Sequence, residues 1–293
     1  MAFSRGVWYM VVSVFFFSCM GLMVKLVAHI PSTQVVFFRS AISFLLSFWL
    51  LKRQGVSVWG IHRKHLLLRG LFGAVALILF YETLQEIPLA SAVTIGFLAP
   101  IFTTILGIFI VREKVRPIQW LFFSLAFVGV IMVQGFDPRV QWLYLVIGIV
   151  ATFFSGLAQS FIRKINTKEH PLVIIFYFPL ITTPLSGAYS FFNWVPPQGW
   201  DWAILIAIGL LTQFAQFFMT KSIQLEELSK VSIIRYLSIV YALIFGYIFF
   251  DETYSVLAYA GMGLAILGVV ANVWYKQNLA KKSKRAKIER KVL

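Results

Sequence analysis

The most constraining feature of this sequence is a stretch that occurs twice. Residues 89–131 and 228–270 align without a gap at a constant offset of 139 residues, and a glutamate, Glu113 or Glu252, occupies the same position in both. Identical pairs at this offset include Leu89 and Leu228, Leu98 and Leu237, Gly107 and Gly246, and Gly129 and Gly268. A single ungapped register over this length indicates an internal duplication.

The composition assigns the chain to a membrane. Hydrophobic residues make up 60% of the sequence and charged residues only 13%, whereas a soluble domain has about 25% charged residues. Apolar runs of the length needed to cross a bilayer recur along the chain. The expected helices are residues 6–28, 34–51, 66–85, 89–111, 117–134, 141–162, 171–192, 201–220, 228–250 and 255–275.

The lysines and arginines predict the orientation. When both termini are placed inside, 21 of the 26 fall in inside segments and only Arg139 falls in an outside loop. The positive-inside rule therefore predicts cytoplasmic termini and a multi-pass protein of the cell membrane, with the bacterial inner membrane as the expected location. The basic tail, residues 276–293, is interpreted as a patch for anionic lipid headgroups and not as a nucleic-acid site.

Duplication and topology together predict an all-α integral membrane protein of ten transmembrane helices in two inverted five-helix repeats. The expected units are residues 1–138, residues 139–275 and the cytoplasmic tail 276–293. Because each unit has an odd number of crossings, the second enters the membrane upside down. This is the architecture of transporters that open a central site to either face in turn.

The repeated helical hairpin resembles the drug/metabolite transporter superfamily, EamA type. The residues that carry the resemblance are Pro100, Gly107, Glu113, Gly129, Gly246, Glu252 and Gly268. The second repeat departs from the pattern at Ile239, which stands opposite Pro100. The resemblance implies that helices 1–4 and 6–9 surround a cavity, with helices 5 and 10 outside it. Three short pieces, residues 37–39, 68–70 and 234–237, resemble a subgroup that includes S-adenosylmethionine uptake carriers.

Enzyme chemistry is disfavoured because the sequence has no HExxH, GxSxG or Walker motif, and its histidines and aspartates lie in loops or at helix ends. The single Cys19 excludes a multi-cysteine metal site. We expect no enzyme activity, catalytic residue, metal or cofactor. A channel or scaffold without a transport cycle is the alternative from another class, although the sequence has no carbonyl-filter loop.

Polar groups inside the expected helices are the candidate substrate ligands. Arg235 lies seven residues into the ninth helix, where a charge is costly and is usually retained for function; snorkelling is the other reading. The substrate-binding candidates are Arg235, Tyr236, Arg39, Gln213, Gln216, Gln159, Tyr81 and Tyr241. For the glutamines, hydrogen bonds between helices are the alternative, and for the aromatic residues, packing.

The remaining charges have more local interpretations. Glu82 is a candidate for proton coupling or for a structural ion pair with Arg39, while Arg69 and Lys25 are expected to snorkel to the membrane surfaces. A stripe of small residues, Gly261, Ala265 and Gly268, permits close helix contact within the bundle or in a homodimer.

The function that follows is secondary transport of a small organic metabolite across the cytoplasmic membrane by alternating access. A zwitterionic or anionic substrate is expected, such as an amino acid derivative or S-adenosylmethionine, because the helix interiors hold several cations and few acids. A broad-specificity efflux carrier of drugs or metabolites is the alternative.

Overall fold

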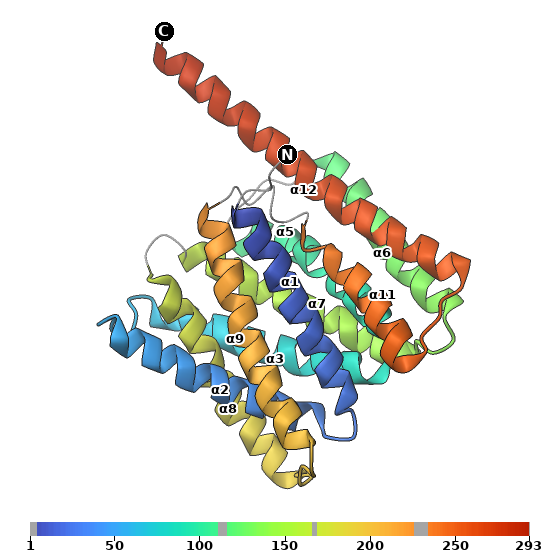
Figure 1. Ribbon diagram of the computed structural model, residues 1–293. Coiled ribbons are helices and arrows are strands. Elements are labelled where there is room, and N and C mark those ends of the chain that lie inside the picture. The colour runs from blue at the N-terminus through green and yellow to red at the C-terminus, as the bar shows by residue number, and fades with distance from the viewer. Residues whose placement is uncertain (1–4, 111–115, 166–168, 226–233, 293) are drawn as a thin grey trace.

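The computed structural model describes residues 5–110, 116–165, 169–225 and 234–292, and all regular structure within these ranges is helical (Figure 1). The helices are α1 (Arg5–Leu26), α2 (Ser32–Arg53), α3 (Arg63–Glu86), α4 (Leu89–Gly96), α5 (Ala99–Ile110), α6 (Pro117–Phe136), α7 (Trp142–Ile165), α8 (Pro171–Phe192), α9 (Asp201–Leu225), α11 (Leu237–Phe250) and α12 (Val256–Val292).

The apolar runs form membrane-crossing segments, as the sequence predicts. In the described ranges, eight segments are long and apolar enough to span a bilayer, with α4 and α5 counted as one, and two shorter apolar helices lie at Pro117–Val133 and Leu237–Phe250. These ten positions match the ten expected segments, and the all-α membrane fold is confirmed.

The helix ends repeat at the offset found in the sequence. Helices α2 and α8 begin at residues 32 and 171 and end at residues 53 and 192; α3 and α9 end at residues 86 and 225. The contacts repeat as well: α1 packs on α9 as α7 packs on α3, and α2 packs on its own equivalent α8. The first unit therefore contacts the second through the same helices by which the second contacts the first, as is expected of two units related by a two-fold axis.

The fourth expected helix is interrupted, which the sequence interpretation of one helix over residues 89–111 did not foresee. Helix α4 ends at Gly96 and α5 begins at Ala99, while the amides of Phe97 and Leu98 donate to carbonyls three residues back. Pro100 is the physical cause, because it has no N–H and its ring excludes the carbonyl of residue 96 from a helical bond. Two half-helices therefore replace one span.

A comparable interruption precedes α11. The expected ninth helix covered residues 228–250, but in the described part of this segment the helical residue Ile234 is followed by a turn at Arg235 and Tyr236, and α11 begins at Leu237. Because Ile239 stands where the first repeat has Pro100, proline does not explain this turn. The expected residues 228–233 lie outside the described ranges.

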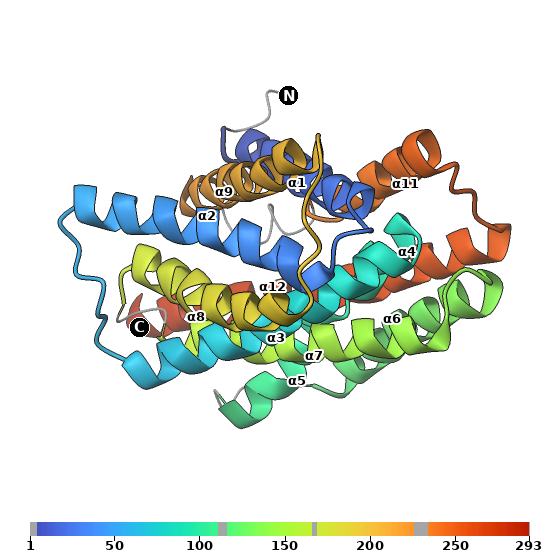
Figure 2. The ribbon, with the colours of Figure 1, turned by 90° about the horizontal axis from the view of Figure 1, so that it is seen from below.

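Helices α6 and α12 form a separate pair at one edge of the bundle, away from α2 and α8 (Figures 1 and 2). A Cβ on Gly129 would lie 2.4 Å from the backbone nitrogen of Ala265, so only glycine allows the two helices to approach this closely. Buried Gln119 donates to Asn272 at 2.8 Å in the same interface. The small-residue stripe is therefore used within the chain. Helix α12 continues through the basic tail and projects beyond the bundle.

Candidate substrate site

Two pairs of equivalent residues touch each other and so mark the two-fold axis. Arg39 of α2 and Phe178 of α8 are 139 positions apart, and the Arg39 Cζ lies 5.9 Å from the centre of the Phe178 ring. Phe97 and Tyr236, also 139 positions apart, have ring centres 4.8 Å apart. A residue can meet its own equivalent only close to the axis. Transporters of inverted repeats bind substrate in such a place, beside interrupted helices.

Arg39 is held from several sides. Its side chain is only 7% exposed, its Nε donates to the Thr212 hydroxyl at 3.1 Å, and its guanidinium lies 5.5 Å from the centre of the Tyr81 ring. The ion pair considered with Glu82 is not formed, because Glu82 instead accepts a hydrogen bond from the Ser32 hydroxyl at 2.5 Å. Arg39 is thus anchored by a hydroxyl and an aromatic face.

Arg69 does not snorkel, contrary to the sequence interpretation. Its Cζ lies 4.7 Å from the centre of the Phe178 ring. Its Nη1 lies 3.8 Å from the point where a Cβ on Gly73 would stand, one turn farther along α3. The side chain therefore runs along the helix toward the Phe178 ring, because Gly73 leaves room for both the ring and the guanidinium. Its place on the axis depends on α8, which sequence spacing within α3 cannot reveal.

The other aromatic candidates divide between the axis and ordinary packing. Tyr81 is buried beneath Arg39, and its hydroxyl donates to the Met20 sulfur at 2.9 Å. Tyr236 lies on the axis against Phe97. Tyr241 instead packs between Phe15 and Phe245, at ring-centre distances of 5.6 and 6.2 Å, and so takes part in the contact between α1 and α11.

The amide candidates lie on two helices. Gln159 of α7 donates to Ser155 of the same helix at 3.2 Å. Gln213 and Gln216 are half-buried on α9. The role of these three glutamines as substrate ligands stays a prediction.

Arg235 does not occupy the mid-helix position that the sequence suggested. It lies in the turn before α11, and its side chain is exposed. Its neighbours Ile234 and Tyr236 line an apolar pocket of about 480 Å³ between α1 and α11, together with Trp8. The lining of this pocket is mostly apolar, and the role of Arg235 as a substrate ligand stays a prediction.

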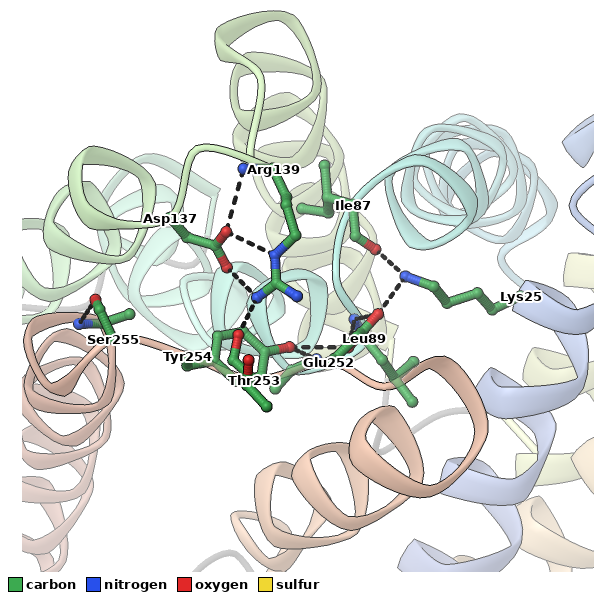
Figure 3. A network of polar contacts seen from close by, with 11 residues as sticks. Lys25, Ile87, Leu89, Asp137, Arg139, Glu252, Thr253, Tyr254 and Ser255 are labelled. Carbon is green, nitrogen blue, oxygen red and sulfur yellow. Dashed lines mark hydrogen bonds and ion pairs between the residues drawn. The ribbon is translucent and has the colours of Figure 1, made fainter.

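The sequence analysis missed a buried polar network around Glu252 (Figure 3). Glu252 is 6% exposed and pairs with Lys25 at 2.7 Å. It also accepts from the Leu89 amide at 2.9 Å, and the Tyr254 hydroxyl donates to it at 2.9 Å. A carboxylate is favourable here because the amides at the start of α4 are unpaired by the helix itself. Lys25 therefore pairs with Glu252 and also donates to the Ile87 carbonyl, and it does not snorkel.

A second ion pair supports this network from the side. Arg139 binds Asp137 through its Nε at 2.9 Å and also donates to the Thr253 carbonyl. The bonds to Asp137 raise the pKa of Arg139, and burial raises the pKa of the Tyr254 phenol. Tyr254 therefore stays protonated and acts as a donor to Glu252.

Local sequence places the Glu252 side chain. Asp251 ends α11 in a left-handed conformation with φ of 52°, which turns the chain back so that the Glu252 amide donates to the Gly246 carbonyl at 3.0 Å. A Cβ on Gly246 would lie 2.5 Å from the Glu252 carboxylate. Glycine six residues before the glutamate thus leaves room for the carboxylate to lie against the helix in this position. The sequence contained this signal, since the same spacing recurs at Gly107 and Glu113.

In the described residues, no group of three or more His, Cys, Asp or Glu side chains could hold a metal ion. The site is built from guanidinium, hydroxyl and aromatic groups and from one carboxylate network. These groups can bind and orient a molecule, and they form no recognisable arrangement of nucleophile and base.

Comparison with known proteins gives a consistent result. The chain is 30% identical over 92% of its length to the pseudopaline exporter CntI of Pseudomonas aeruginosa, covering 95% of that protein. It is 25% identical to the S-adenosylmethionine uptake transporter of Rickettsia prowazekii over 76% of each chain. A solved crystal structure with 16% identity superimposes with a TM-score of 0.62 over 93% of this chain and 98% of the other, which supports the fold alone.

The EamA-like transporter family matches the chain twice, at residues 4–134 and 142–274. The two matches fall on the two halves that the sequence repeat and the helix contacts relate to each other. This chain therefore belongs to the EamA-like transporter family, whose members and relatives are transporters and not enzymes.

Proposed function

We propose that this chain is a secondary transporter of the cytoplasmic membrane that moves a small organic metabolite by alternating access, with both termini cytoplasmic. The observation that carries the proposal is the contact between equivalent residues, Arg39 with Phe178 and Phe97 with Tyr236. It puts a cationic and aromatic group on the two-fold axis, where two repeats that rock against each other can expose it to either face. The substrate is zwitterionic or anionic, such as an amino acid derivative or S-adenosylmethionine.

The Glu252 network supplies a closed gate in this proposal. Lys25, Ile87 and Leu89 belong to the first repeat, and Glu252 belongs to the second, so the 2.7 Å ion pair ties the two repeats together at one face. In the proposed orientation, which the positive-inside distribution favours, this face is the outer one. The gate opens when the carboxylate separates from the start of α4.

The two residues of this ion pair have equivalents at the offset of the repeat. The equivalents of Lys25 and Glu252 are Lys164 and Glu113, 139 positions away in opposite directions. Lys25 is 12% exposed in its ion pair, whereas the Lys164 side chain is exposed. Glu113 lies outside the described residues.

Counterflow in proteoliposomes tests the function. The purified protein is loaded with unlabelled compound and tested for entry of label, with a panel of S-adenosylmethionine, pseudopaline, amino acids and nucleosides. A carrier gives saturable entry that internal substrate accelerates. Unsaturable entry without acceleration for every compound that crosses indicates a channel and contradicts the proposal, and protein-free liposomes provide the background.

A further inference from the structure

The guanidinium groups of the buried Arg39 and the half-buried Arg69 meet at one aromatic ring. The guanidinium carbons of Arg39 and Arg69 lie 5.9 and 4.7 Å from the centre of the Phe178 ring, so these carbons are within about 11 Å of each other, with the ring between or beside them. Both arginines belong to the first repeat and Phe178 to the second. The cluster therefore straddles the interface between the repeats.

Among the residues that the structure describes, neither arginine has an acidic partner. In the described ranges, the ion pairs are Lys25 with Glu252, His29 with Asp201 and Arg139 with Asp137. The Nη1 of Arg39 and the Nε and Nη1 of Arg69 are buried and make no hydrogen bond. Three guanidinium nitrogens thus carry unused N–H donors at the place where the two repeats meet.

Burying these two guanidinium groups without a partner costs free energy unless an acceptor or an anion binds to them. A buried charge normally has a partner, and two cations near each other repel more strongly in a low dielectric. The faces of Tyr81 and Phe178 offset part of this cost by cation–π attraction. They supply no hydrogen-bond acceptor, so the N–H donors remain unsatisfied.

We propose that Arg39 and Arg69 together bind an anionic oxygen group, a carboxylate or a phosphate, on the transported molecule. The inference rests on the proposed function and names the chemical class of its substrate. A guanidinium offers parallel N–H groups that match the oxygens of a carboxylate or phosphate. An anion at this point satisfies the free donors and removes the repulsion between the cations. The Thr212 bond fixes the Arg39 fork, and Gly73 gives Arg69 its path to the ring.

The same contacts couple anion binding to the position of the second repeat. Thr212 and Phe178, which hold the two arginines, both belong to the second repeat. Thr212 is the equivalent of Gly73, at the offset of 139 residues. The arginines therefore lie between the repeats, and an anion that draws them together also changes their contacts with the second repeat.

Thermal unfolding of the purified full-length protein in detergent tests this inference. The probes are glutarate and inorganic phosphate at constant ionic strength, with neutral glutaramide as the control compound. The variants are Arg39→Met and Arg69→Met, with Arg63→Met as a matched control because Arg63 is exposed at the start of α3. At least one anion is expected to raise the melting temperature of the parent and of Arg63→Met, while the rise is lost in both other variants and absent with glutaramide.

The melting temperature without ligand separates a binding role from a structural one. Removing an uncompensated buried charge is expected to leave the melting temperature of Arg39→Met and Arg69→Met equal to or above that of the parent. Arg69→Lys keeps the charge without the fork and is expected to lose most of the anion response.

Two results overturn the inference. One is a parent that neither anion stabilises, and the other is a stabilisation that persists in Arg39→Met and Arg69→Met. Failure here differs from failure of transport: counterflow that is saturable and unchanged in Arg39→Met leaves the carrier function standing but removes the anion site.

Discussion

Neutralising Glu252 is the perturbation that the structure predicts most sharply. Glu252→Gln keeps the size of the side chain but removes the charge that faces Lys25 at 2.7 Å, at a site where the two side chains are 12% and 6% exposed. Loss of one partner from a buried pair costs about 3–5 kcal/mol. Lys25 retains the Ile87 carbonyl as an acceptor, so we take the lower end, about 3 kcal/mol.

This energy becomes a conformational shift if the pair exists only in the closed state. Since each 1.4 kcal/mol is about a tenfold change in an equilibrium constant, about 3 kcal/mol moves the closed-to-open ratio roughly a hundredfold. The first turn of α4, which Glu252 covers, becomes accessible on opening. Ala90 is fully buried there, and a cysteine at this position reports the opening.

The assay is the labelling rate of Ala90→Cys by an impermeant maleimide in a background in which Cys19 is replaced by serine. The Glu252→Gln change is expected to raise this rate by one to two orders of magnitude. Tyr254→Phe is the graded control, because it leaves the ion pair and removes only the 2.9 Å hydrogen bond to Glu252 and the 3.3 Å hydrogen bond that the Ala90 amide donates to the Tyr254 hydroxyl. At about 1 kcal/mol for each bond, its effect on the labelling rate is expected to be smaller than that of Glu252→Gln.

A double-mutant cycle completes the test. The double variant Lys25→Met with Glu252→Gln removes both charges, so its effect is expected to fall well short of the sum of the two single effects. Labelling of Ala90→Cys that is unchanged by Glu252→Gln, with no coupling in the cycle, refutes the reasoning that this pair holds the repeats together.

Three further outcomes are expected. Gly129→Leu is expected to force α6 and α12 apart, since even a Cβ at this position would lie 2.4 Å from the Ala265 nitrogen. The melting temperature is therefore expected to fall by several degrees. An unchanged melting temperature contradicts the close packing of these two helices. Arg235→Lys is expected to retain counterflow, because its exposed side chain lies in a turn; loss of counterflow supports the role as a substrate ligand that the sequence suggested. In intact cells, an impermeant thiol reagent is expected to reach a cysteine at position 198 and not one at position 285, and the reverse labelling inverts the topology.

The sequence predicts the spans well because bilayer thickness acts on every helix in the same way. It also contains the two-fold relation, since residues 139 positions apart carry the same helix ends. The break after Gly96 was open to prediction from Pro100, because proline removes a helical bond wherever it stands inside a span. The turn at Arg235 and Tyr236 has no such local signal.

The charged residues were harder to interpret because their partners lie in the other repeat. Spacing within one helix gives the depth of Lys25 or Arg69 but not the direction of its side chain. Lys25 turns toward Glu252, which is far away in sequence, and Arg69 turns toward Phe178 through the space left by Gly73. Knowing which residues are equivalent in the two repeats predicts side-chain contacts only when the position of the two-fold axis is also known.

The central claim is that the site between the repeats opens to one face at a time. A single cysteine at Thr212, which binds Arg39 on the axis, tests it in a Cys19-free protein reconstituted in vesicles of known orientation. We expect the impermeant reagent to reach this cysteine from either face, and we expect Glu252→Gln to raise the rate from the outer face and lower it from the inner one. Labelling from one face only, or a change of the same sign at both faces, contradicts alternating access.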